Sequence, residues 1–218
     1  MDKRIFNLII LDKSGSMFRL GQAPVDTVNE TIESLRKEQK GRSNWEFFFS
    51  LVTFNDESNT VYDNVPINEA NLMKDEEYDP ANCTALYDAM GFAITHQKKF
   101  VSENDNVVVT IITDGYENAS KEYSGDTIKK IVEELKTKGW VFTFIGANQD
   151  VLKAGSNISV DNVMAFDATD DGLRCAVNNV TRNRSRLFRQ IDTGDFSSED
   201  ANRNFFMDED TENVDKVK

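Results

Sequence analysis

The chain has 218 residues, a net charge of −13, and 39% hydrophobic residues that include 15 phenylalanines. The acidic balance disfavours a nucleic-acid-binding protein, because phosphate recognition needs a basic face, and it equally disfavours an anionic membrane surface as partner. The apolar content is sufficient for one sizeable core. No apolar run reaches the roughly 18 residues of a membrane span, so we expect no membrane association.

The two cysteines, Cys83 and Cys175, lack the spacing of a metal-binding or redox motif. The first residues lead directly into an apolar run, without the small-residue cleavage site of a secretory leader. We therefore expect two free thiols and a cytoplasmic location. Nothing in the sequence specifies an oligomer, and a monomer is the default expectation.

The first third of the chain predicts strands separated by one helix. An apolar run at 4–11 predicts a strand buried on both faces, and aromatic residues at 45–54 predict a second strand. The helical spacing of apolar residues at 25–39 places a crossover helix between them, so these strands should be parallel. Only five polar residues precede a third strand at 60–65, so we expect it to form an antiparallel hairpin with the second.

The rest of the chain continues the alternation of helices and strands. The predicted elements are a helix at 85–101, a strand at 106–113, a helix at 127–138 ended by Gly139, a strand at 140–145, a short helix at 149–155, a weak strand at 162–166 and an amphipathic helix at 171–188. This order predicts an α/β fold with a doubly wound, Rossmann-like open sheet of about six strands. The sheet should be mostly parallel, with one antiparallel edge strand and helices on both faces.

The composition changes near residue 191. From residue 192 to the end, nine acidic residues face three basic ones, a net charge of −6. A segment this charged, with one short apolar cluster at 205–207, is typical of a disordered or loosely docked chain. We therefore expect one domain over residues 1–190 and an acidic, flexible tail over residues 191–218.

Two of the predicted strands end in a carboxylate, the first in Asp12 and the fourth in Asp114. In an open α/β sheet, ligands bind beyond the carboxyl ends of the strands, where the strand order reverses. If the second and third strands build outward on one side of the first, the fourth must lie on its other side. Asp12 and Asp114 should then meet at this switch point.

Three hydroxyl groups accompany the two carboxylates. Ser14 and Ser16 follow Asp12 in a turn, and Thr84 opens the helix that begins at residue 85. Carboxylate and hydroxyl oxygens are the ligands that hard divalent cations prefer. Two carboxylates balance a dication without over-neutralising it, so the ion keeps affinity for one further anionic oxygen. The sequence therefore predicts a site for a hard divalent cation, formed by Asp12, Ser14, Ser16, Thr84 and Asp114.

The stretch DKSGS at 12–16 resembles the DxSxS motif of von Willebrand factor type A domains, and Thr84 and Asp114 match the family's remaining site positions. The resemblance covers roughly residues 4–189. It implies a metal-ion-dependent adhesion site that binds Mg²⁺ or Mn²⁺. In such a site the two serines are direct ligands, and the aspartates and threonine reach the ion directly or through water. It also implies a protein partner whose Asp or Glu completes the coordination, and a cytoplasmic bacterial or phage type of domain.

The sequence departs from the family pattern at one place, just before Thr84. Many members of the family carry glycines before the threonine, where this chain has Asn82 and Cys83. Around the site we expect a partner-contacting rim, with inward packing of Phe18 and Leu20 as the competing expectation. The rim residues are Met17, Phe18, Arg19 and Tyr116.

We expect a binding module and not an enzyme, with two alternatives. A phosphatase of the haloacid dehalogenase type also begins with a strand that ends in a nucleophilic aspartate, here Asp12. Its second aspartate would stand at Ser14, which cannot act as a general acid or base. The single histidine, His96, is expected on the surface, so a Ser-His-Asp triad is not predicted. A scaffold with a vestigial metal site is the other alternative.

Overall fold

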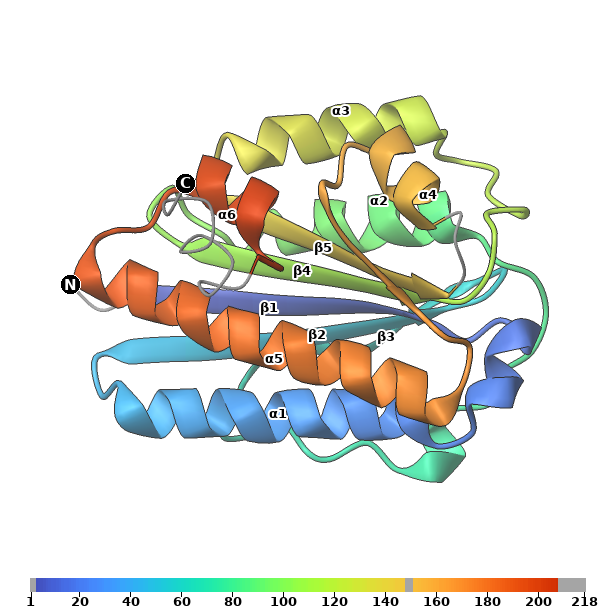
Figure 1. Cartoon of the computed structure of the whole chain (residues 1–218), viewed down its shortest axis with the longest axis horizontal. Helices are drawn as coiled ribbons and strands as arrows, with labels where there is room; N and C mark the ends of the chain where they lie inside the picture. Colours follow the sequence, from blue (N-terminus) through green and yellow to red (C-terminus); the bar gives the residue numbers. More distant parts are fainter. Residues whose placement is uncertain (1–2, 148–150, 208–218) are drawn as a thin grey trace, which may run out of the picture.

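The computed structural model describes residues 3–147 and 151–207 (Figure 1). Within them, six strands form a sheet in the order β3-β2-β1-β4-β5-β6. Neighbouring strands are parallel except for the antiparallel pair of β2 and β3, which places β3 at the edge. The predicted fold class, a doubly wound α/β sheet with one antiparallel edge strand, is confirmed.

The observed elements follow the predicted ones closely, and the second and fourth predicted strands agree to the residue. The strands are β1 (Lys3–Asp12), β2 (Trp45–Phe54), β3 (Ser58–Pro66), β4 (Asn106–Thr113), β5 (Trp140–Ala147) and β6 (Asn162–Phe166). The α-helices are α1 (Ala23–Gly41), α2 (Leu86–Gln97), α3 (Gly125–Lys136), α4 (Val151–Asn157), α5 (Asp170–Thr193) and α6 (Ser198–Asn204). Two short 3₁₀ helices are η1 (Gly15–Leu20) and η2 (Asp75–Glu77).

The sheet separates two apolar cores, because successive side chains of a strand point to opposite faces. In β1, Ile9 and Leu11 pack with α1 and α5, whereas Leu8 and Ile10 pack with α2, α3 and α4. Figure 1 shows α1 and α5 side by side on one face, with α2 and α3 on the other. Both faces of the central strands are thus covered, and their carboxyl ends are left for a ligand site.

The segment after residue 190 differs from the flexible tail that we expected. Over residues 191–207 it contains the end of α5 and the helix α6, and Phe205 is only 3% exposed. The Asn202 side chain donates to the backbone carbonyl of Trp140 at 2.8 Å. Polar side chains here satisfy backbone groups of the sheet, which composition cannot reveal. The remainder of the predicted tail, residues 208–218, lies outside the described residues.

Three smaller expectations can be compared with the structure. The second helix begins at Leu86 with Ala85 as its N-cap, so Thr84 lies one residue before the cap and does not open the helix itself. Cys83 and Cys175 are exposed free thiols, as expected. The described residues contain no helix that is long and apolar enough to cross a membrane. Positions 149 and 150 of the predicted short helix lie outside the described part of the chain.

Candidate functional site

The carboxyl ends of β1 and β4 lie side by side and bring the two aspartates together. The strands pair in parallel, with Leu11 opposite Ile112 in the register. Because β2 and β3 build outward on one side of β1, β4 occupies the other side, as the element order predicts. Asp12 and Asp114 therefore meet at the switch point of the sheet, where they are 0% and 6% exposed.

Asp12 is held rigidly by three hydrogen bonds. One carboxylate oxygen, Oδ1, accepts from the backbone N–H of Ser14 at 2.6 Å, and Oδ2 accepts from the hydroxyl of Thr113 at 2.5 Å. The phenol of Tyr78 donates to the Asp12 backbone carbonyl at 2.6 Å. Thr113 and Tyr78 were not among the predicted site residues. Tyr78 lies far away in sequence, so no local signal identifies it.

Burial dominates the electrostatics of Asp12. It raises the pKa of the Asp12 carboxyl to about 6 although the hydrogen bonds from Thr113 and Ser14 oppose the shift, and the nearby charge of Asp114 adds to it. Burial also raises the pKa of Tyr78, with the charges of the two aspartates acting in the same direction. A buried carboxylate of this kind is poorly stabilised by the protein alone, and a cation would favour its ionised form.

The short helix η1 directs two side chains onto Asp114. Ser16 donates from Oγ to Asp114 Oδ1 at 2.6 Å and lies 3.3 Å from the hydroxyl of Ser14. Arg19 follows three residues later, and residues three apart lie above one another on a 3₁₀ helix. Its Nε and Nη2 lie 3.1 and 3.0 Å from Asp114 Oδ2. One helical turn therefore holds both oxygens of this carboxylate.

Gly115 permits the close approach of Thr84 to this group. A Cβ atom at position 115 would lie 2.8 Å from Thr84 Oγ1, and 3.5 Å from both Asp12 Oδ2 and Ser16 Oγ. These oxygens therefore surround one small space beside the glycine, which has no side chain to fill it. The structure therefore brings together all five predicted residues, which are Asp12, Ser14, Ser16, Thr84 and Asp114.

The loop that carries Thr84 is fixed by neighbouring loops. Asn118 accepts from the Thr84 backbone N–H and donates its own N–H to the Thr84 carbonyl, both at 3.0 Å. The backbone N–H of Gly15 donates to the carbonyl of Asn82 at 3.1 Å. Asn82 has φ +69°, a conformation that asparagine tolerates better than most residues. The departure from the family's glycines is thus accommodated by the backbone.

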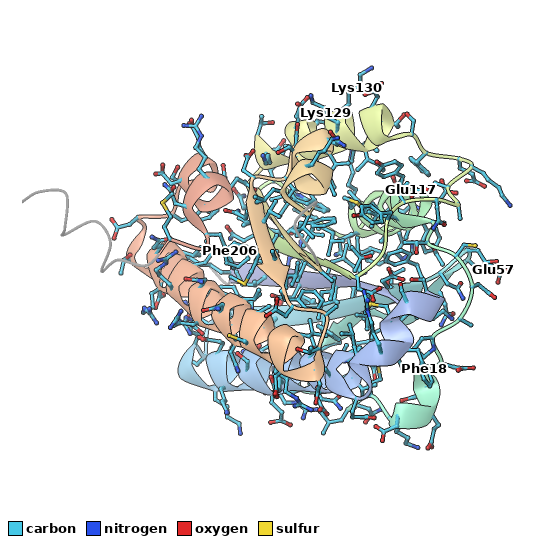
Figure 2. All side chains as sticks on the ribbon, turned by 45° about the vertical axis from the view of Figure 1, so that its right-hand side comes forward. Phe18, Glu57, Glu117, Lys129, Lys130 and Phe206 are labelled. Atoms are coloured by element: carbon cyan, nitrogen blue, oxygen red, sulfur yellow. The ribbon has the colours of Figure 1, made fainter. Side chains whose placement is uncertain are left out.

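Glu117 fixes the loop after β4 to the start of α2. Its carboxylate accepts from the backbone N–H groups of Tyr87, Ala119 and Ser120 at 2.8 to 3.0 Å. Asp88 accepts from three backbone N–H groups of the same loop, and these donors lower its pKa although burial opposes them. Figure 2 shows Glu117 directed toward α2. Local sequence gives no sign of the link to α2, because the bond from Tyr87 joins residues that are 30 positions apart in the chain.

The four predicted rim residues differ in their exposure to solvent. Phe18 is 77% exposed and points away from the protein (Figure 2), and Tyr116 is 63% exposed. Arg19 is half exposed and lies over Asp114. Met17 is fully buried in the core under α1 and α5, so its assignment to the rim is wrong. The turn of η1 directs Met17 inward and its neighbour outward, an orientation that the apolar run does not specify.

The donor set fits a hard divalent cation. Two buried carboxylates and three hydroxyls supply only oxygen atoms, which suits Mg²⁺ or Mn²⁺ better than a softer metal. Within residues 3–147 and 151–207, no group of three or more His, Cys, Asp and Glu side chains is placed to share an ion. An ion at this site would therefore depend on the serine and threonine hydroxyls to complete its coordination.

Comparison with known proteins agrees with this architecture. A family model described as von Willebrand factor type A domain matches residues 8–183. The chain belongs to this family. The match includes both aspartates and all three hydroxyl residues. No curated protein sequence matches the chain.

Several solved structures share the fold of this type A domain at low sequence identity. The vWF domain of the type V pili tip protein Mfa5 from Porphyromonas gingivalis has a TM-score of 0.61 and 11% identity, over 85% of this chain and 96% of that one. Manganese-loaded TRAP protein from Plasmodium vivax has a TM-score of 0.55 and 17% identity, over 77% and 70%. Proximal thread matrix protein 1 from the mussel byssus has a TM-score of 0.59 and 16% identity over 82% of this chain, which spans only 45% of the mussel protein.

Proposed function

We propose that this type A domain is a metal-dependent protein-binding module. In this proposal Asp12, Ser14, Ser16, Thr84 and Asp114 hold a divalent cation, Mg²⁺ or Mn²⁺, and a partner protein presents an Asp or Glu side chain to it. The observation that carries the proposal is the convergence of oxygen atoms from three separate loops around the space beside Gly115. The ion would supply a positive centre with an open position for one anionic oxygen.

The residues of the chain prepare the site for such a ligand. Ser16 and Asp114 are already joined by a hydrogen bond, and Asn118 fixes the backbone of Thr84. Phe18 and Tyr116 are exposed beside the site and supply apolar contact area to a partner. A cavity of about 300 Å³, lined by Asp114 and Tyr116 among others, adjoins the site and offers space for a neighbouring side chain of that partner.

The family and its neighbours support the general class of this function. The TRAP protein structure is manganese-loaded, and Mfa5 is a pilus tip protein. Both likenesses concern the fold, because the sequence identities are 17% and 11%. An adhesion or protein-interaction role is the class that such relatives suggest. The cytoplasmic location and the acidic partner remain predictions.

Calorimetric titration with Mn²⁺ and Mg²⁺ tests the metal site directly. The wild type should bind one equivalent, and Asp12→Ala should bind none. Glu57→Ala is a matched control, because this exposed acid lies near the same edge of the sheet and has no place in the site (Figure 2). Absence of metal-dependent heat in the folded wild type would favour the alternative of a vestigial site.

Partner recognition needs a second experiment. An array of peptides with Asp or Glu at varied positions should bind the metal-loaded wild type and lose binding when a chelator is added. Matched peptides with Asn or Gln in place of the acid serve as controls. Equal binding of acidic and amide peptides would contradict capture of a carboxylate, even if the metal site itself is present.

The phosphatase alternative is disfavoured by the environment of Asp12. Both carboxylate oxygens already accept hydrogen bonds, from Ser14 and Thr113, so neither is directed freely toward a phosphorus atom. Ser14 also occupies the position of the second catalytic aspartate. Turnover of a generic phosphate ester that depends on Mg²⁺ and is abolished by Asp12→Asn would nevertheless establish hydrolase activity.

A further inference from the structure

A small cavity lies inside the molecule, between the helices α1 and α5 and the centre of the sheet. Its volume is about 10 Å³, and it lies in the core, away from the site at the strand ends. The lining is mainly aliphatic, from β1, β4, β5 and α5, but four polar residues also line it: Thr27, Thr31, Thr110 and Arg184. Figure 1 shows α1 and α5 running next to each other over this part of the sheet.

Polar atoms at this cavity lack partners. Arg184 is 3% exposed, and neither its Nε nor its Nη2 has a hydrogen-bond partner in the described residues. Thr27 is 2% exposed, and its hydroxyl is unpartnered in the same way. Nearly all buried polar groups in proteins are hydrogen-bonded, to protein or to ordered water. Dry cavities are apolar, and this one is not.

Within the described residues, the guanidinium also forms no ion pair. Burial lowers the pKa of Arg184 to about 10, although the charge of Glu38 opposes the shift, so the group stays protonated at neutral pH. The carboxylate of Glu38 is already bonded to Arg42 and to Ser185. A buried cation without a paired anion is strongly disfavoured. An occupant that carries negative charge and only accepts hydrogen bonds would satisfy both needs of Arg184.

We propose that this cavity is an internal binding site for one small monovalent anion, with chloride as the ligand. Nε and Nη2 of Arg184 and the hydroxyl of Thr27 donate to the ion. The volume is close to the roughly 10–15 Å³ that one water needs, which excludes sulfate, phosphate and carboxylates. The bound ion joins α1 to α5 on one face of the sheet and stabilises the folded chain.

Thermal unfolding of the full chain in chloride and in gluconate, at equal ionic strength, tests the site. A chelator is present so that anions cannot act through the metal site. Chloride at about five times its dissociation constant should raise Tm by roughly 2–4 °C over gluconate. Arg184→Met should abolish this difference, whereas Arg189→Met, an exposed arginine on the same helix, should retain it.

A second variant and a crystallographic observation keep the proposal testable if Arg184→Met fails to fold. Thr27→Val keeps the shape of the side chain, should fold, and should require at least threefold more chloride for half of the Tm shift. Crystals grown in bromide should show an anomalous peak between Arg184 and Thr27. Equal Tm values in the two salts, an unchanged chloride effect in Thr27→Val, or water in place of bromide would overturn the proposal.

Discussion

Replacing Asp12 with asparagine should stabilise the metal-free protein. Asp12 is 0% exposed, and burial raises its pKa from 3.8 to about 6. The ionised form is therefore disfavoured in the native state by about two pKa units, or about 3 kcal/mol at pH 7. Asp12→Asn removes this charge and keeps an oxygen that accepts from Ser14. The new amide N–H donates to the oxygen of the Thr113 hydroxyl. The hydroxyl hydrogen then donates to the carbonyl of Gly115, which lies 3.3 Å away.

The pH dependence follows from the same shift. In the unfolded chain the Asp12 carboxyl loses its proton near pH 3.8, and in the native state near pH 6. The native state therefore holds more protons in this interval, and the stability of the metal-free wild type should fall as the pH rises from about 4 to about 6. The advantage of Asp12→Asn should be small at pH 4 and at most about 3 kcal/mol at pH 7, a Tm rise of roughly 6–12 °C.

Urea and thermal unfolding with a chelator, at several pH values, measure this difference. Glu57→Gln, which changes an exposed acid, should shift the free energy of unfolding by less than about 0.5 kcal/mol. If the site holds metal, excess Mg²⁺ should stabilise the wild type and not the variant, because binding to the native state adds stability by mass action. The reasoning is refuted if Asp12→Asn is less stable than the wild type at pH 7 without metal.

Three further substitutions test other parts of the site. Arg19→Gln removes the cation that lies against the site, and Mn²⁺ affinity measured by electron paramagnetic resonance should rise by about twofold to fivefold; weaker binding would contradict competition. Gly115→Ala places a Cβ 2.8 Å from the Thr84 hydroxyl and should reduce Mn²⁺ affinity at least tenfold, whereas Gly41→Ala, with open space around it, should leave affinity unchanged. Asn118→Ala removes the acceptor for the Thr84 N–H and should lower the free energy of unfolding by about 1–3 kcal/mol in urea titrations; a change within error would show that water replaces it.

Local pattern was sufficient for the elements of the fold. The strands at 45–54 and 106–113 are rich in aromatic and β-branched residues, and the structure gives them the same bounds. Because chain connectivity limits how a hairpin and crossover helices can join one sheet, the element order also placed β1 beside β4. The position of the site followed from that order, before any contact was known.

The sequence did not predict which way side chains point or which residues distant in the chain pack together. The sequence did not distinguish buried Met17 from exposed Phe18, because both are apolar neighbours in one short turn. It also predicted a loose chain after residue 190, where Asn202 and Phe205 instead pack on the sheet. In each case the outcome depends on what lies opposite the side chain in space.

The sequence by itself determined the fold class, the position of β1 beside β4 and the five candidate oxygen-bearing residues, because periodicity and the order of elements can be read along the chain. The tertiary structure decided which groups support them. It placed Thr113, Tyr78 and Asn118 against the site and Arg19 over Asp114. In the part of the chain that the structure describes, it also left Nε and Nη2 of Arg184 buried without a hydrogen-bond partner. Hydrogen bonds and desolvation act between residues far apart in the chain, so they exist only once the chain has folded.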